Sequence, residues 1–270
     1  MHLCQIFYDE ASRQSLDPAF TPMDNSGNER PDWHEYWPIR KFLLTNTFSD
    51  DDYLGFFSPR FREKTGADGA RVVSTVREFR GEILSFSPYL DQCAIYPSIF
   101  QQGEAHHQGL IQCCADVARH LGLHLDVGAL FGDSTTTIFA NYFVARYAFW
   151  KKWFDFAEEI FRLCEAGGNS IGDALNRPTA HRDATATPMK VFVMERLVCL
   201  MMEGLGIEAR MGLDLRYAPL SLLGSDQLRG ALFVCDALKG QFRRTGNVGF
   251  KELYFAQQSE VLRALQAASQ

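Results

Sequence analysis

The chain has 270 residues, of which 46% are hydrophobic and 22% charged, with a net charge of −6 and a pI near 5.7. This composition predicts a globular protein with a sizeable core and excludes a disordered chain. No run of Lys or Arg is longer than two residues, so we expect no nucleic-acid partner. The seven cysteines form no C-x-x-C pair, and several fall at apolar helix positions, which favours reduced thiols and a cytoplasmic location.

The N-terminal segment MHLCQIFYDEASR lacks the positive start and long apolar stretch of a signal peptide. No apolar run approaches the length of a membrane span. We therefore expect any work at a membrane to be done by peripheral association.

The first third of the chain predicts two strands around a long loop and a helix. Apolar runs at His2–Tyr8 and Tyr53–Ser58 read as strands. The segment 9–32, rich in Pro, Gly, Asp and Asn, is expected to be a packed functional loop. Asp32–Asn46 predicts a helix with a capping box between Asp32 and Glu35, whose start Pro38 would shift or kink.

Strands and helices continue to alternate in the middle of the chain. The pattern predicts helices over Ala67–Phe79, Gln108–Leu121 and Ala148–Glu165, and strands over Glu82–Ser87 and Thr135–Arg146. Such alternation predicts an α/β domain, over residues 1–220, with a mainly parallel sheet flanked by helices. Two further helices after Ser225 predict a C-terminal helical appendage over residues 221–270.

The segment Met189–Glu203 predicts a helix that is apolar on every side except at Glu195 and Arg196. Thr187 suits the N-cap, Pro188 suits the first helical position, and glycines follow the run. A carboxylate in such a helix must find a partner or shift its pKa. Glu195 is therefore either half of a structural ion pair or a functional group. Because adjacent residues on a helix do not face each other, we expect Glu195 and Arg196 to have different partners.

Ligands of open α/β sheets bind beyond the carboxyl ends of the strands. That rule nominates Asp9 after the first strand, Arg60 and Lys64 after the second, and Ser87 after the third. The basic pair would suit phosphate, or it could be an ordinary solvated loop.

The segment Gln101–His107 adds Glu104, His106 and His107, although adjacent histidines lack the helical spacing of a metal site and could simply start a helix. The acidic run Asp50–Asp52 precedes a strand and is read as a turn rather than a metal motif. The sequence contains no Walker phosphate loop, dinucleotide-binding turn or nucleophile elbow, so kinase, dehydrogenase and hydrolase readings lose their usual support.

The order of five segments resembles that of bacterial capsule and lipopolysaccharide-type glycosyltransferase-like proteins: FYDEASRQSLDPAFTPMDN, DWHEYWPIRKFLL, DDDYLGFFSPRF, NYFVARYAFWKKWFDF and FVMERLVCLMM. The resemblance covers about residues 3–215 and implies a GT-A-like fold that binds a nucleotide-diphosphate sugar. It places Ser58 and Arg60 on the donor side, Asn141 beside the acceptor, and Glu195 as a catalytic or acceptor-orienting carboxylate. The segment EILSFSP carries serines where such a fold often carries Asp-x-Asp, so the cofactor stays open between Mn²⁺, Mg²⁺ and none, and we assign no metal ligand.

Strand ends and resemblance together define one predicted site. Its residues are Glu195 for catalysis; Asp9, Ser58, Arg60, Lys64 and Ser87 for the donor; and Glu104, His106, His107, Asn141 and Arg196 for the acceptor. The predicted function is transfer of a sugar from a nucleotide sugar to a glycan or lipid-linked acceptor in bacterial surface polysaccharide synthesis. The alternatives are a non-catalytic nucleotide- or carbohydrate-binding protein, and an assembly subunit of a polysaccharide complex that uses an aromatic surface around Trp33, Tyr36 and Trp37.

Overall fold

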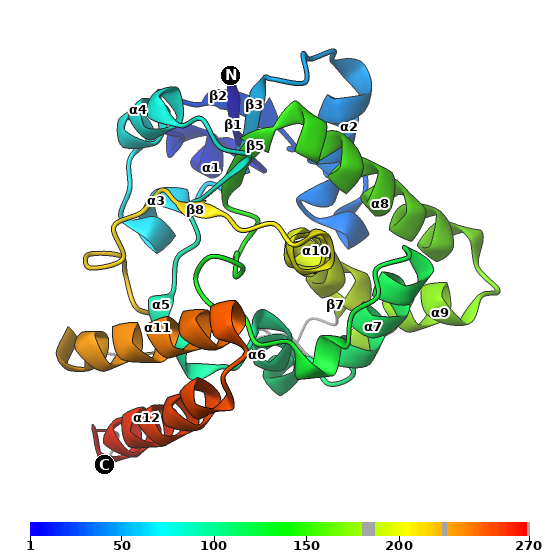
Figure 1. Cartoon of the computed structure of the whole chain (residues 1–270). Helices are drawn as coiled ribbons and strands as arrows, with labels where there is room; N and C mark the ends of the chain where they lie inside the picture. Colours follow the sequence, from blue (N-terminus) through cyan, green and yellow to red (C-terminus); the bar gives the residue numbers. More distant parts are fainter. Residues whose placement is uncertain (180–186, 223–225, 269–270) are drawn as a thin grey trace.

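A computed structural model describes residues 1–179, 187–222 and 226–268 of the chain. At its centre lies a six-stranded sheet in the order β2-β1-β3-β5-β4-β8 (Figure 1). The strands are β1 (His2–Phe7), β2 (Thr21–Asp24), β3 (Tyr53–Phe57), β4 (Ile83–Ser85), β5 (Phe143–Arg146) and β8 (Arg210–Met211). Strand β5 is antiparallel to both of its neighbours, and every other neighbouring pair is parallel. The predicted α/β architecture with a mainly parallel sheet is confirmed.

Both faces of the sheet are covered by helices. One face packs against α2 (Tyr36–Thr45), α8 (Tyr147–Ala166) and α10 (Met189–Leu205), and the other against α3 (Phe61–Thr65) and α4 (Gly69–Glu78) (Figure 1). Alternate strand residues face opposite ways: Ile6 and Phe56 join the first core, while Leu3 and Val144 join the second. The strands are apolar on both sides because both faces are buried.

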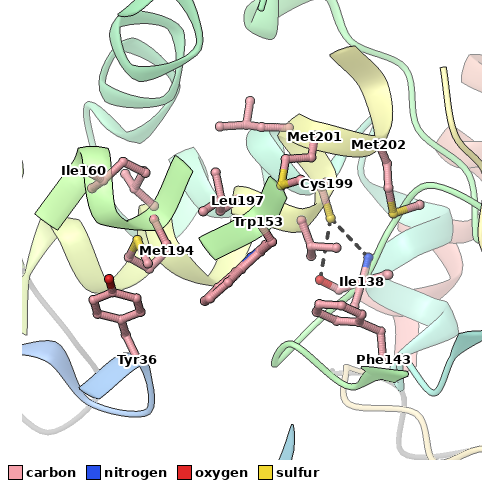
Figure 2. Close-up of a cluster of buried hydrophobic side chains, with 14 of the residues drawn as sticks. Tyr36, Ile138, Phe143, Trp153, Ile160, Met194, Leu197, Cys199, Met201 and Met202 are labelled. Carbon is pink, nitrogen blue, oxygen red and sulfur yellow. Dashed lines mark hydrogen bonds between the residues drawn. The ribbon is translucent and has the colours of Figure 1, made fainter. Parts of the chain in front are cut away.

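Helix α10 runs through the larger core, as its sequence predicts. Figure 2 shows Met194, Leu197 and Cys199 of this helix among side chains from α2, α8 and the sheet. The helix begins one residue later than predicted, with Pro188 rather than Thr187 at the N-cap. It ends at Leu205, and the C-cap residue Gly206 has a φ of 66°, the left-handed conformation that glycine adopts without strain.

The segment 9–32, expected to be one packed functional loop, contains regular elements instead. The segment contains a short helix, α1 (Glu10–Gln14), the edge strand β2 and the 3₁₀ helix η1 (Pro31–Trp33). The capping box is also wrong, because α2 begins at Tyr36 and Asp32 instead binds Arg30 and Lys190. Pro38 falls in the first turn of α2, where a missing backbone N–H costs nothing.

The strand predicted over Thr135–Arg146 is limited to its last four residues. Ala140 and Asn141 have φ values of 58° and 53°, and this left-handed backbone cannot continue a strand. The remaining described elements are α5 (Leu90–Ile95), α6 (Ile99–His106), α7 (Leu110–His120), η2 (Val127–Ala129), α9 (Ser170–Asn176), η3 (Asp226–Leu228) and a small sheet of β6 (Pro178–Thr179) and β7 (Thr187–Pro188).

The C-terminal region forms two helices, α11 (Arg229–Thr245) and α12 (Val248–Ala268), as expected; Ser225 lies outside the described residues. They pack on each other and on α5, where Leu232 and Tyr254 share an apolar cluster with Leu90. All seven cysteines are buried and free, and burial raises the pKa of the Cys199 thiol to about 12. No helix among the described residues is long and apolar enough to cross a membrane.

Candidate functional site

A pocket of about 510 Å³ opens beyond the carboxyl ends of β1 and β2. Its described lining comes from the ends of these strands, the segment through η1 into α2, Asn141 shortly before β5, and the helices α8 and α10. The lining residues are Tyr8, Asn25, Asn28, Pro31, Trp33, His34, Glu35, Tyr36, Ile39, Asn141, Trp153, Val191, Met194 and Glu195.

The sheet topology explains why the pocket forms at this edge. Tyr8 directly follows β1, and Asn25 directly follows β2. Asn141 precedes β5, which is antiparallel and therefore starts where its parallel neighbours end. The three side chains meet at one edge of the sheet although they come from distant parts of the sequence. The pocket thus occupies the place where open α/β sheets bind ligands.

Two of the aromatic side chains in the wall are held by hydrogen bonds to glutamates. Trp33 is 1% exposed, and its Nε1 donates to Glu165 at 3.1 Å. The Tyr36 hydroxyl donates to Glu158, which also binds Arg40 at 2.6 Å. The rings of Trp33 and Tyr36 are therefore each held by a hydrogen bond to a glutamate, which fixes this part of the wall.

Two carboxylates face the pocket. Glu35 stands at the N-terminus of α2 and accepts a hydrogen bond from the Tyr8 hydroxyl at 3.3 Å. Burial raises the pKa of Glu35 to about 7, and the negative charge of Glu195 adds to this rise, whereas Lys64 and the bond from Tyr8 oppose it. A carboxyl group that titrates near neutrality can take up or give a proton during a reaction.

Glu195 projects from α10 and has a side chain that is 46% exposed. The expectation that it and Arg196 would not face each other is wrong, because their charged groups lie 3.7 Å apart. Arg196 is nevertheless committed elsewhere: it donates to the backbone oxygens of Ile99 and Phe192 and to Gln102 Oε1. Arg196 is thus a buried structural residue rather than an acceptor-binding one, and the Glu195 carboxylate remains available to the pocket.

Two polar atoms of the lining have no hydrogen-bond partner in the described part of the chain. They are Asn141 Oδ1 and Trp153 Nε1. The Trp153 side chain is 1% exposed, and Asn141 sits in the left-handed backbone conformation described above. Both atoms are enclosed by protein, so they are unsatisfied buried groups of lining residues rather than contacts shown to face the pocket.

None of the five predicted donor residues lines this pocket. Asp9 caps α1 through Ser12, and hydrogen bonds from Ser12 lower its pKa. Ser58 is buried and bonded to the Tyr142 hydroxyl, while Ser87 accepts the Phe139 N–H at 2.9 Å.

The basic donor candidates lie after β3. Arg60 is exposed and makes a two-pronged ion pair with Glu63. Lys64 lies over the Tyr142 ring, 5.6 Å from its centroid, and its charge acts on Glu35. Of the five predicted donor residues, Lys64 is the one whose positive charge lowers the pKa of the pocket residue Glu35.

The predicted acceptor residues do not form one group. Asn141 lines the pocket together with Glu195, but Glu104 accepts the backbone N–H groups of Gly109 and Ile111 at 2.8 and 2.9 Å. His107 stacks on Phe192 with ring centroids 3.6 Å apart. Glu104 and His106 instead border a separate surface hollow beside α7 and β6. The grouping of these residues with Asn141 in one acceptor site is wrong.

Sequence reasoning missed the residues between Trp33 and Tyr36 as site residues. Every residue of the run Trp33-His34-Glu35-Tyr36 is aromatic or titratable, and this composition is the feature of the sequence that could have indicated a site. From the sequence, Glu35 is assigned to a helix capping box, and Trp33 and Tyr36 are assigned to an exposed aromatic interface. Trp33 and Tyr36 are buried, so they cannot serve as the exposed anchors of a protein interface.

The residues at the end of β4 do not fit a divalent cation. Ser85 and Ser87 are buried, Ser85 Oγ accepts the Ser87 N–H at 3.1 Å, and neither supplies the carboxylate that Mg²⁺ or Mn²⁺ prefers. The described residues include no cluster of three His, Cys, Asp or Glu that could hold a metal. Asp50 and Asp51 pair with Lys151 and Arg146 in the predicted turn.

Comparisons with known proteins give no relative: no family model, no curated protein and no solved structure matches the chain.

Proposed function

We propose that this protein is a GT-A-like glycosyltransferase that moves a sugar from a nucleotide-diphosphate donor to a hydroxyl of a glycan or lipid-linked acceptor. The observation that carries the proposal is the pair of carboxylates, Glu35 and Glu195, in an aromatic-walled pocket at the carboxyl edge of a mainly parallel sheet. Aromatic faces suit the apolar faces of sugar rings, and carboxylates suit their hydroxyl groups. The sheet is compatible with the GT-A-like fold that the sequence resemblance implies.

In this proposal Glu35 is the proton acceptor. The acceptor hydroxyl oxygen attacks the anomeric carbon, and the bond from that carbon to the diphosphate oxygen breaks with its electron pair leaving on the phosphate. The hydroxyl proton passes to the Glu35 carboxylate, whose pKa of about 7 matches that task. Glu195, assigned to catalysis from the sequence, would orient the acceptor and keep the pKa of Glu35 high through its charge.

The donor diphosphate would lie on the β3 side of the pocket. Lys64 and Arg60 follow that strand, and both carry the positive charge that a leaving diphosphate needs. Arg60 would exchange its pair with Glu63 for a phosphate, since both partners of that pair are well exposed.

A binding protein without turnover is the second candidate. It is favoured by one observation: the serines predicted at the donor side use their hydroxyl groups inside the protein. Binding of a nucleotide sugar with no release of nucleoside diphosphate would select this candidate.

The test has two stages. Thermal-shift measurements with a panel of nucleoside diphosphates and nucleotide-diphosphate sugars, each with Mn²⁺, Mg²⁺ or EDTA, would identify the donor, because a bound ligand raises apparent stability. Release of nucleoside diphosphate from that donor would then be compared among the parent, Glu35→Gln and Glu195→Gln.

We expect turnover to fall by about 10²–10⁴-fold in Glu35→Gln, the scale of a lost general base. Glu252→Gln, on the exposed surface of α12, is the matched control and should leave turnover unchanged. Absence of binding by every donor, with and without metal, would contradict the proposed function.

A further inference from the structure

The pocket holds two carboxyl groups in different environments. Glu35 accepts the Tyr8 hydroxyl at 3.3 Å, and burial raises the pKa of Glu35 to about 7, so half of the molecules hold this proton at that pH and more of them below it. Glu195 has a side chain that is 46% exposed, and its carboxylate lies 3.7 Å from the Arg196 guanidinium. At slightly acidic pH the pocket therefore contains one proton donor and one negative charge.

The titratable groups around Glu35 come from four parts of the chain. They are Tyr8 after β1, Lys64 in α3, Tyr142 before β5 and Glu195 in α10. After burial, Lys64 lowers the pKa of Glu35, Glu195 raises it, and the bond from Tyr8 lowers it. His34, the preceding residue, also lines the pocket. The proton on Glu35 is thus set mainly by burial, with Lys64 and Glu195 acting in opposite directions.

The charge of the lining decides which reactions these two groups can assist. The described lining contains Glu35 and Glu195 but no Lys or Arg. Negative charge opposes the oxyanion that forms when an ester or amide is hydrolysed, and it stabilises a transition state that carries positive charge. Cleavage of a glycosidic bond has such a transition state, because the anomeric carbon becomes oxocarbenium-like. One protonated and one ionised carboxyl group are the pair that this cleavage uses.

We propose that the pocket also hydrolyses an uncharged glycoside, with Glu35 as the acid and Glu195 as the base. The proton of Glu35 passes to the glycosidic oxygen while the bond from that oxygen to the anomeric carbon breaks, and the electron pair of the bond stays on the oxygen. A water molecule adds to the anomeric carbon and gives one proton to Glu195. The products are a free sugar and an alcohol, and proton exchange with solvent restores both carboxyl groups.

This activity goes beyond the proposed transfer and does not depend on it. Hydrolysis needs Glu35 protonated, whereas transfer from a nucleotide donor needs Glu35 ionised. Because the pKa of Glu35 is about 7, the two forms coexist near neutrality, and pH separates the two activities.

The test measures hydrolysis of aryl glycosides by the full chain over a range of pH. The panel consists of phenyl and dinitrophenyl glycosides of glucose, galactose, mannose and N-acetylglucosamine, in both anomeric forms. We expect at least one phenyl glycoside to be hydrolysed, with a kcat/KM that falls as the pH rises through about 7 and Glu35 loses its proton.

Two variants test the assigned roles through the leaving group. Glu35→Gln should lower kcat/KM for the phenyl glycoside by about 10²–10⁴-fold, but for the dinitrophenyl glycoside of the same sugar by less than about tenfold, because dinitrophenolate leaves without a proton. Glu195→Gln should slow both substrates, since water then lacks its base. Glu252→Gln, on the exposed surface of α12, is the control and should change neither.

Lys64 allows a test of the acid that leaves the pocket lining intact. Lys64 is absent from the described lining, and its charge lowers the pKa of Glu35. Lys64→Met should therefore move the fall in kcat/KM to higher pH, whereas Lys64→Arg keeps the charge and should leave it in place. Melting curves would verify that each variant is folded.

Each outcome supports or overturns the proposal. No hydrolysis of any glycoside at any pH, or an equal loss for both leaving groups in Glu35→Gln, would overturn it. A kcat/KM that rises through about pH 7 would also overturn it, because Glu35 would then act as a base. Hydrolysis without release of nucleoside diphosphate from any donor would leave a glycosidase and remove the transferase, whereas donor turnover without glycoside hydrolysis would leave the transferase alone.

Discussion

The Tyr8 hydroxyl donates a hydrogen bond to the Glu35 carboxylate at 3.3 Å. This bond joins the end of β1 to the start of α2 across 27 residues of sequence, and it lies in the wall of the pocket. A donor to the ionised carboxylate stabilises its charge, so the bond lowers the pKa of Glu35 against the larger rise that burial causes.

Removing this hydroxyl group should therefore raise the pKa of Glu35. We expect Tyr8→Phe to raise the pKa of Glu35 above its value of about 7. The measurement is an NMR titration of the glutamate side-chain carboxyl carbons, with Glu35→Gln used to assign the signal. Tyr217→Phe is the control, because Tyr217 is 76% exposed. An unchanged or lower pKa in Tyr8→Phe would show that the bond does not stabilise the carboxylate.

The raised pKa of Glu35 should also make stability depend on pH. The folded protein holds a proton on Glu35 up to about pH 7, whereas the unfolded chain releases it near the ordinary value of 4.5. The contribution to stability is thus complete below about pH 4.5 and is lost as the pH rises through about 7. Its size is at most about 3–4 kcal/mol, since each pKa unit corresponds to about 1.4 kcal/mol.

Glu35→Gln should remove this loss of stability at rising pH. We expect the variant to be more stable than the parent at about pH 8 and to differ less at about pH 5. Urea unfolding at a series of pH values would measure the free energy of unfolding of both proteins. Parallel pH profiles in the two proteins would contradict the raised pKa.

The ion pair behind Trp33 should be important for both stability and the shape of the pocket. Lys190 is 3% exposed, and its Nζ lies 2.7 Å from Asp32 and 4.3 Å from the Trp33 ring centroid. Asp32→Asn leaves this buried charge without its carboxylate, so we expect a loss of about 3–5 kcal/mol in urea unfolding. Glu10→Gln, which breaks the exposed pair with Arg13, should cost less than about 1 kcal/mol. Equal effects of the two changes would contradict the structural role of Lys190.

The contact between α6 and α10 permits only glycine at position 103. A Cβ atom there would lie 2.7 Å from Arg196 Nε and 2.8 Å from Leu110 Cδ2. Because Arg196 is held by three hydrogen-bond partners, it cannot move away easily, and Gly103→Ala should destabilise the protein by about 1–3 kcal/mol.

Gly230→Ala is the matched control, since nothing lies within 4 Å of the added atom and the residue is helical. It should stabilise the protein by up to about 1 kcal/mol. Chemical denaturation of both variants would check the contrast, and a neutral Gly103→Ala would show that Arg196 is free to relocate.

The amino-acid sequence by itself determined the local elements and the fold class. Four elements lie nearly where the hydrophobic pattern predicts them: the helices α8 and α10 and the strands β1 and β3. Their positions could be predicted because hydrophobic periodicity and helix-ending glycines are local features that extend over only a few residues. The rule that ligands lie beyond the strand ends predicted Asp9, Arg60, Lys64 and Ser87, and none of these lines the pocket, although the pocket itself lies beyond the carboxyl ends of β1 and β2.

Only the tertiary structure decided which side chains share the pocket. Glu35 has the spacing of a capping residue, yet β1 places Tyr8 against it and α10 brings the charge of Glu195 near it. Asn141 reads as part of a strand, but its left-handed backbone turns it into the pocket wall. These relationships depend on strand pairing and helix packing between segments far apart in the chain, and local sequence patterns carry no record of them.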